Sequence, residues 1–409
     1  MSAETVYHEI EEFLQAYLPA EVHKPTRKRL TLLVVGMIRA CHGAPSRIAQ
    51  AIHQLGLTSA QAESLERRLR RTENDPQISA EVCLHPLARQ RLLLGRPREL
   101  LLILDPTTQE DRVVMVSVAV WYRGRALPLA WTLWPANTPL AGEGFWVRIK
   151  ALLRRVAGIL PVHIPVTWLA DRAFGTPAFT DLLALWGWHY VVRVQNQTAY
   201  RDRQGREGAV GRLVCLPKQR AKLRGQVFKK RGWREASVIV AWGRGHKHPL
   251  CLVSDLGTHW YLLRLYRRRS PIEATFRDYK SSGWQWEQGQ VTNLEHLERL
   301  LVGMALATWI VLGIGTQVAA EWLARPATGQ RRTVPWVGKR SLFQLGLSRL
   351  QRLLASSGLE KWSWLLTDWE APNWQEQIHS HHLQAFIWAW HRTPRSRRIV
   401  NVLPKTVRP

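Results

Sequence analysis

The first 95 residues carry apolar side chains at a helical period. Apolar positions recur three and four residues apart in four segments, which are Ile10 to Leu18, Leu30 to Ile38, Ile48 to Leu55 and Ala62 to Leu69. This spacing is typical of amphipathic helices. Lys and Arg gather beside these segments, around residues 24–29 and 67–71. Residues 1–95 are therefore predicted to form a helical region with basic ends.

The pattern changes near residue 98, where short apolar runs replace the helical period. Three runs separated by turn residues predict a meander of strands. Two further strands then alternate with two helices, and this order predicts an α/β fold in which helices flank a mixed sheet. The predicted strands are 99–105, 113–121, 126–134, 164–170 and 190–194, and the helices are about 141–157 and 177–186.

A basic segment interrupts this alternation. Between residues 196 and 248, fourteen Lys and Arg residues stand against three acids, and stretches such as Ala236 to Trp242 alternate like strands. Residues 196–260 are predicted to be a basic β insertion, which carries Trp233 and Trp242. Residues 261–325 and the basic, Trp-rich residues 326–409 are predicted to be mainly helical.

The net charge of the chain restricts the classes of molecule that it is expected to bind. Lys and Arg number 58 against 31 Asp and Glu, a formal charge of +27 over 409 residues. A chain this basic repels itself unless it binds a large anion, and the commonest large anions are nucleic acid and acidic membrane. Contact between the N-terminal helices and DNA is the interpretation we favour over a merely solvated basic bundle.

The cysteines and the N-terminal residues indicate the cellular compartment in which the protein is expected. The four cysteines lack the spacing of a zinc site or a disulfide framework, and the acidic start is unlike a signal peptide. We therefore expect a cytoplasmic protein. Leu300 to Ala320 is 21 residues without a charge, long enough to span a membrane. Its Gly and Thr residues favour a buried core helix, with a membrane-associated protein as the alternative.

Three acids are candidates for chemistry. Asp105 and Asp171 each end a predicted strand, where two carboxylates from neighbouring strands can hold a hard divalent cation. Each could instead be an ordinary turn residue. Glu273 shares one helical face with Arg277 and Lys280 at i, i+4 and i+7. The alternative is that Glu273 merely completes a capping box with Ser270.

The spacing Tyr266-x2-Arg269-x3-Glu273-x6-Lys280 resembles the Y-R-E-K signature of DDE transposases of the insertion-sequence-four type. Leu-Ala-Asp171-Arg-Ala-Phe-Gly resembles the second-acid motif of that family, and Ile-Leu-Asp105 the first. The resemblance covers about residues 95–315. It implies an RNase H-like core with a β insertion before the last acid. Ser270-Pro271 departs from the family pattern, because it starts a helix late and can move Tyr266 and Arg269 off its face.

The resemblance also implies a site and its partners. Asp105, Asp171 and Glu273 would bind two Mg²⁺ ions, for which Mn²⁺ can substitute. Tyr266, Arg269 and Lys280 would hold DNA phosphates, with Arg277 beside them. Cleavage through a DNA hairpin would place a flipped base on Trp233 or Trp242. The partners would be double-stranded DNA, as terminal inverted repeats and as target, and a second copy of the chain on that DNA. The setting would be the nucleoid of a prokaryotic cytoplasm, without a membrane.

Five regions follow from pattern and resemblance together. They are a helical DNA-binding region (1–95), the first part of an RNase H-like core (96–195), the basic β insertion subdomain (196–260), the last part of the core with the Y-R-E-K helix (261–325), and a helical basic region for dimerisation and DNA contact (326–409). Two other functions stay open. One is a metal-dependent nuclease of the same fold, and the other is an inactive DNA-binding relative.

Overall fold

The computed structural model describes residues 3–138, 140, 143–289, 291–324 and 340–355. Within these residues ten strands form one sheet, in the order β3-β2-β1-β4-β5-β10-β9-β8-β6-β7. Strands β1, β4 and β5 run parallel to one another, and β2 lies antiparallel between β1 and β3. The order β3-β2-β1-β4-β5 is that of an RNase H-like core and confirms the predicted fold class. The five strands are β1 (Leu100–Gln109), β2 (Val113–Tyr122), β3 (Arg125–Pro135), β4 (Val166–Ala170) and β5 (His189–Arg193).

Strand β1 is longer than its apolar run predicts. Residues 100–105 are buried, as expected of a central strand with neighbours on both sides. Beyond Leu104, β1 loses β4 as a partner but stays paired with β2 to Gln109. Asp105 therefore lies within a strand rather than at its end, although it does stand where the parallel pairing stops.

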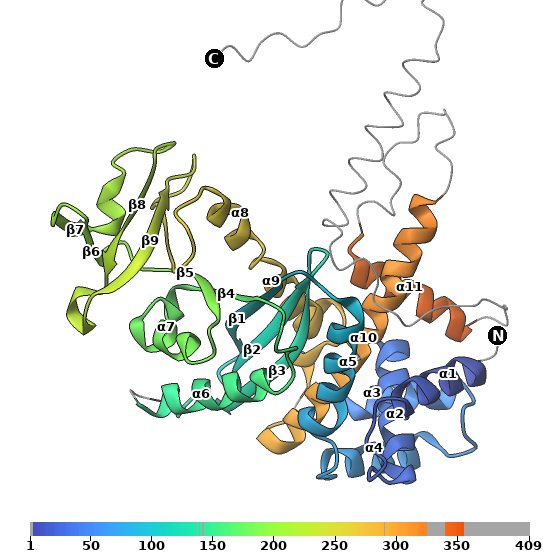
Figure 1. The fold of residues 1–409 in the computed structure, drawn as a ribbon. Coiled ribbons are helices and arrows are strands. Elements are labelled where there is room, and N and C mark those ends of the chain that lie inside the picture. Colours follow the sequence, from blue (N-terminus) through green and yellow to red (C-terminus); the bar gives the residue numbers. More distant parts are fainter. Residues whose placement is uncertain (1–2, 139, 141–142, 290, 325–339, 356–409) are drawn as a thin grey trace, which may run out of the picture.

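The predicted insertion does form strands, but they continue the sheet of the core. The antiparallel strand β10 lies beside β5, with Leu252 opposite Arg193, and β9, β8, β6 and β7 follow outward. Figure 1 shows this outer part of the sheet extending away from the core. The boundaries of the five predicted regions stay predictions. The added strands are β6 (Ala199–Asp202), β7 (Glu207–Ala209), β8 (Arg220–Val227), β9 (Arg234–Ala241) and β10 (Leu250–Ser254).

Helices cover the sheet and connect its strands. Helix α6 (Glu143–Ala157) packs on β3, and α7 (Pro177–Ala184) contacts β5. After β10 the chain forms two short helices, α8 (Tyr261–Arg267) and α9 (Pro271–Arg277). They lead from the outer sheet back toward the core (Figure 1). Helix α11 (Leu342–Ala355) packs along α10.

Helix α10 (Leu294–Leu323) contains the uncharged stretch that is long enough to span a membrane. Of its most apolar window, 89% is buried inside the protein. The Trp309 indole donates a hydrogen bond to the Pro128 carbonyl of β3, and the Thr308 hydroxyl accepts one from the Trp284 indole. These contacts are those of a core helix, as the sequence predicts.

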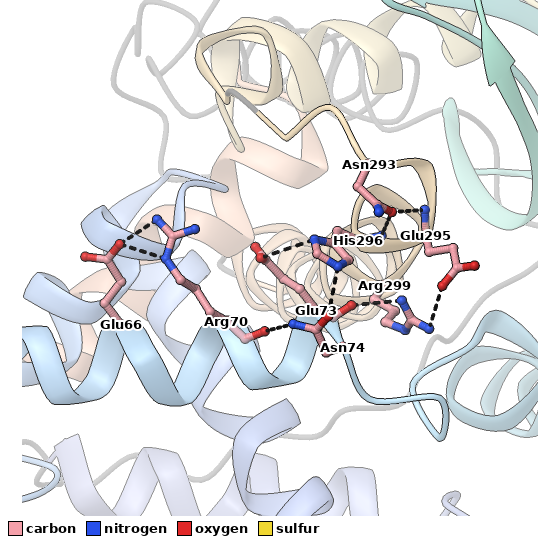
Figure 2. Close-up of polar contacts among 8 residues, drawn as sticks. All are labelled: Glu66, Arg70, Glu73, Asn74, Asn293, Glu295, His296 and Arg299. Atoms are coloured by element: carbon pink, nitrogen blue, oxygen red, sulfur yellow. Dashed lines mark hydrogen bonds and ion pairs between the residues drawn. The ribbon is translucent and has the colours of Figure 1, made fainter.

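The N-terminal helices pack on the core through α10. They are α1 (Ala3–Gln15), α2 (Lys24–Ala40), α3 (Pro45–Gln54), α4 (Ala62–Glu73) and α5 (His85–Gly95). Figure 2 shows the polar contacts between α4 and α10. Arg299 donates to the carbonyls of Glu73 and Asp75, and His296 contacts the Asn74 side chain. Asn293 caps α10 through its side-chain oxygen. The helices predicted in this region are confirmed, and their contact with DNA stays a prediction.

Of residues 326–409, only α11 and the two residues before it fall within the described part of the chain. The helix there agrees with the prediction. The rest of the expected dimerisation and DNA-contact region lies outside the described residues.

Candidate active site

The register of the parallel strands brings the first two acids together. Leu104 of β1 is opposite Ala170 of β4, and this is the last pair of that ladder. The next residue along the chain is an acid in each case, Asp105 within β1 and Asp171 directly after β4. Gly175 keeps the turn after Asp171 close to the sheet, because a Cβ there would lie 2.2 Å from the Arg193 carbonyl oxygen. The two carboxylates therefore lie at one edge, as the sequence predicts.

The third acid reaches this edge from α9, through an arginine. Arg269 Nη1 donates to Asp105 Oδ2 at 2.8 Å, and Arg269 Nη2 donates to Glu273 Oε1 at 2.6 Å. The guanidinium of Arg269 therefore lies between two of the three acids and is largely buried, while 61% of the Glu273 side chain is exposed. Such charge-assisted bonds are short and directional. This joins Asp105 on β1 to Glu273 on α9, and Asp171 after β4 lies near enough to Asp105 for its charge to act on it. We refer to these three acids as the acid cluster.

Ser270-Pro271 does separate two helices, as the departure from the family pattern indicates. Tyr266 lies in α8, Arg269 in the turn, and Glu273 in α9. The capping-box alternative fails, because the Ser270 side chain caps nothing and its hydroxyl instead donates to the Arg267 carbonyl. Glu273 is thus not held as a cap. Tyr266 is buried, and this burial raises the pKa of its hydroxyl to about 12.

The helical face expected for Glu273, Arg277 and Lys280 does not continue through all three. A π-helical turn at Asp278–Ser282 follows α9 and carries Lys280. Its wider turn departs from the 3.6-residue period on which the i+7 spacing depends. Lys280 Nζ instead pairs with Glu287 at 3.3 Å, whereas Arg277 is exposed. Their binding of phosphates stays a prediction.

Burial dominates the electrostatics of the acid cluster. It raises the pKa of Asp105 to about 6, while Arg269 acts in the opposite direction and Asp171 adds to the rise. Removing a carboxylate from water disfavours its charged form, and a like charge nearby has the same effect. Ionised Asp105 is therefore held at a cost in free energy that a bound cation would relieve.

Replacement of Asp105 by Asn should reveal this cost as a pH-dependent gain in stability. Because the pKa is about 6 when folded against 3.8 for a free Asp, the folded chain keeps a proton between about pH 4 and 6 that the unfolded chain has lost. This carboxyl therefore lowers stability as the pH rises through that window. The measurement is urea unfolding in EDTA. The free energy of unfolding of Asp105→Asn, taken relative to that of the parent, should rise by on the order of 2–3 kcal/mol from pH 4.5 to pH 8.

The exposed Asp111→Asn serves as the matched control and should stay within about 0.5 kcal/mol of the parent at both pH values. An equal loss of stability by Asp105→Asn at both pH values would show that the carboxyl is not strained by its burial.

The donor set suits a hard divalent cation, for which carboxylate oxygens are the preferred ligands. Asp171 Oδ1 is buried without a hydrogen-bond partner, and its nearest cation, Arg193 Nη1, is 3.8 Å away. Yet no three His, Cys, Asp or Glu residues in the described part of the chain lie close enough together to hold a metal. Since Arg269 occupies the space between Asp105 and Glu273, cation binding by this cluster requires its guanidinium to withdraw.

A cationic cavity of about 460 Å³ opens between β8, β9, β10 and α8. Arg193 lines it and also pairs with Asp171, so the cavity adjoins the acid cluster. Register could have revealed Arg193, because Ala170 of β4 is opposite Val192 of β5 and Asp171 is therefore level with Arg193. Other basic residues lining the cavity are Lys218, Arg220, Arg244, His246, His248 and Arg267.

The two tryptophans of the insertion differ in their surroundings. Trp242 lines the cationic cavity, and its indole donates a hydrogen bond to the His246 carbonyl. Trp233 is not among the residues lining that cavity, and the Arg201 guanidinium lies 4.5 Å from the centroid of its ring. Of the two, Trp242 is placed better for stacking on a base brought close to the acids.

The chain is similar to a known protein family over part of its length. Residues 147–310 match the family model of the transposase DDE domain. The match covers less than half of the chain, contains Asp171 and Glu273 and begins after Asp105. No curated protein sequence matches the chain. Among solved structures, the cryo-EM structure of the piggyBac transposase synaptic complex with hairpin DNA is similar, with a TM-score of 0.44 and 9% sequence identity over 92% of this chain and 80% of that chain. The family match supports the predicted relation to DDE transposases.

Proposed function

We propose that the chain is a DNA transposase of the insertion-sequence-four type, which binds the terminal inverted repeats of its element, cuts the DNA and joins the ends to target DNA. One observation carries the proposal above all. Asp105, Asp171 and Glu273, from three different segments, lie at one edge of an RNase H-like sheet, where Arg269 bonds to Asp105 and Glu273 and Arg193 lies 3.8 Å from Asp171. The match to the transposase DDE domain over residues 147–310 supports it independently.

The three acids are the residues that would hold two Mg²⁺ ions, or Mn²⁺ in their place. Divalent cations bound to such carboxylates activate an attacking oxygen and stabilise the leaving oxygen in phosphodiester chemistry. Arg269 would exchange its carboxylate partners for a DNA phosphate when it withdraws, because a planar guanidinium suits either anion. Arg193 and Arg267, from the cationic cavity, would help hold the strand that continues past the cut.

The setting of this reaction is part of the proposal. Two copies of the chain would act together on DNA in the nucleoid of a prokaryotic cytoplasm. Excision would proceed through hairpin ends, with one base flipped onto Trp242. The cationic cavity supports the last step, because the extruded base needs an aromatic face and its phosphates need cations.

The roles of the two tryptophans can be separated by measurement. Trp242→Ala should lower excision about tenfold or more, because stacking of one base contributes about 1–3 kcal/mol. Trp233→Ala is the matched control and should stay within about twofold. The base next to the cut is replaced by 2-aminopurine, whose fluorescence reports unstacking from the duplex. A larger defect in Trp233→Ala than in Trp242→Ala would reverse the assignment.

The proposed function itself is tested with a donor plasmid that carries the gene and its native flanking DNA. Purified chain and Mg²⁺ should excise a defined segment, and an added target plasmid should gain it. Cutting at random positions without joining would point to a nuclease of the same fold. Retarded but intact DNA would point to an inactive DNA-binding relative. Either outcome would contradict transposition by this chain.

A further inference from the structure

Helix α8 carries an exposed strip of aromatic and basic side chains outside the cationic cavity. Its buried side consists of Leu262, Leu265 and Tyr266. Tyr261, Arg264 and Arg268 follow one another three and four residues apart on an exposed side, and Trp260 precedes them. Trp260 is 39% and Tyr261 41% exposed, which is unusual for large aromatic side chains. We refer to Trp260, Tyr261, Arg264 and Arg268, with Lys222 of β8, as the α8 strip.

Each exposed ring of the strip has a cation beside it. Lys222 Nζ lies 5.5 Å from the centroid of the Trp260 ring, and Arg264 Cζ lies 5.7 Å from that of Tyr261. Arg268 Cζ lies 4.6 Å from the centroid of the Trp121 ring, which extends the pattern to the end of β2. Such contacts orient the cations but leave their charge uncompensated. Among the described residues, none of these three cations forms an ion pair, so the strip keeps its positive charge.

The strip ends beside the acid cluster. Arg268 directly precedes Arg269, which binds Asp105 and Glu273. The other exposed side of α8, with Leu263 and Arg267, lines the cationic cavity. The strip and the cavity thus lie on adjoining sides of α8, and Figure 1 shows α8 between the outer sheet and α9. The strip, whose residues are not among those lining the cavity, therefore leads to the acids.

We infer that the α8 strip binds single-stranded DNA and holds an unpaired strand as it approaches the acid cluster. In a duplex the bases stack on one another, and the exposed faces of Trp260 and Tyr261 would have nothing to stack on. Each ring has a cation over one face, so an unpaired base can stack on the other face while the cations meet the phosphates. Duplex DNA would need the cations alone. The inference rests on the proposed function, because cutting and rejoining duplex DNA creates unpaired strands beside the cut.

The test compares binding of labelled single-stranded and duplex DNA by fluorescence anisotropy, in EDTA so that nothing is cut. The probes are a 20-nucleotide oligo-dT and a 20-base-pair duplex. The full-length double variant Trp260→Ala/Tyr261→Ala should bind the single strand at least about tenfold more weakly, since stacking contributes about 1–3 kcal/mol per base. Its affinity for the duplex should change less than about twofold. Trp260→Phe/Tyr261→Phe keeps the rings and should restore single-strand binding.

Leu94→Ala is the matched control, because Leu94 is an exposed apolar residue away from α8, and it should change neither affinity. Unchanged single-strand binding by the double alanine variant would overturn the inference, and so would an equal loss for both probes. If either result is obtained while the parent chain still cuts and joins duplex DNA, the inference fails but the proposed function stands. A parent chain that binds neither probe would overturn the proposed function as well.

Discussion

Replacement of Glu273 by Gln is expected to reduce DNA cleavage at least about a thousandfold. A cation held by a carboxylate contributes several kcal/mol to such a reaction, and each 1.36 kcal/mol is about tenfold in rate. Gln keeps the size of the side chain and an oxygen that can accept the hydrogen bond from Arg269, but it loses the charge. Because 61% of the Glu273 side chain is exposed, its replacement should leave the fold intact. Initial rates of nicking of the donor plasmid in saturating Mg²⁺ measure the effect.

Glu295→Gln is the matched control for Glu273→Gln. Glu295 also accepts an i, i+4 contact from an arginine, Arg299, and is also exposed, but it lies at the start of α10 where it touches none of the three acids (Figure 2). Its cleavage rate should equal that of the parent. A Glu273→Gln protein that cuts at the parent rate would remove Glu273 from the chemistry.

The second large effect is expected at Asp278, through stability. Its carboxylate binds Arg125 of β3, and the two side chains are only 8% and 6% exposed. Burial lowers the pKa of the Arg125 guanidinium to about 10. Asp278→Ala would leave that cation buried without its partner, which costs about 3–5 kcal/mol. Urea unfolding monitored by circular dichroism measures the loss.

The same change should also lower cleavage. Asp278 begins the π-helical turn directly after α9, and Thr275 of α9 donates to the Ala126 carbonyl of β3 at 2.9 Å. Both contacts hold α9, and hence Glu273, against the sheet. The surface pair of exposed Arg70 and half-buried Glu66 supplies a control, and Glu66→Gln should cost less than about 1 kcal/mol. An Asp278→Ala protein as stable as Glu66→Gln would show that the buried pair does not anchor α9.

Recovery of stability by two apolar residues would identify the mechanism. Arg125→Met/Asp278→Leu replaces both charges with side chains of similar volume, and such replacements of buried pairs are often neutral or stabilising. The double variant should therefore be more stable than Asp278→Ala. If it is no more stable, the loss comes from altered packing rather than from an uncompensated charge.

The positions of the core strands could be predicted because each strand is an apolar run that is visible in the local sequence. Apolar runs bounded by turn residues marked β1 to β5, and acids at the ends of those runs marked Asp105 and Asp171. The end of β1 was misplaced, because the pairing of Asp105 with Ser117 of β2 depends on a neighbour that the run itself does not reveal. The Y-R-E-K spacing identified Glu273 as a candidate, but it did not predict that Arg269 bonds to the Glu273 carboxylate.

What the sequence could not supply are contacts between segments far apart in the chain. Arg269 lies 164 positions from Asp105, and Asp278 lies 153 from Arg125, so no local period connects either pair. The outer strands read correctly as strands, yet only their pairing through β10 shows that they continue the core sheet. The π-helical turn at Asp278–Ser282 likewise departs from the helical period that the sequence pattern indicates.

The most direct test of the account is whether the three acids together bind a divalent cation. Electron paramagnetic resonance counts free Mn²⁺ in a titration of the chain bound to uncut end DNA. The account predicts that the parent chain binds Mn²⁺ and that Asp105→Asn, Asp171→Asn and Glu273→Gln each weaken that binding about tenfold or more, on the same DNA. Equal Mn²⁺ binding by the parent and all three variants would contradict a cation site at Asp105, Asp171 and Glu273.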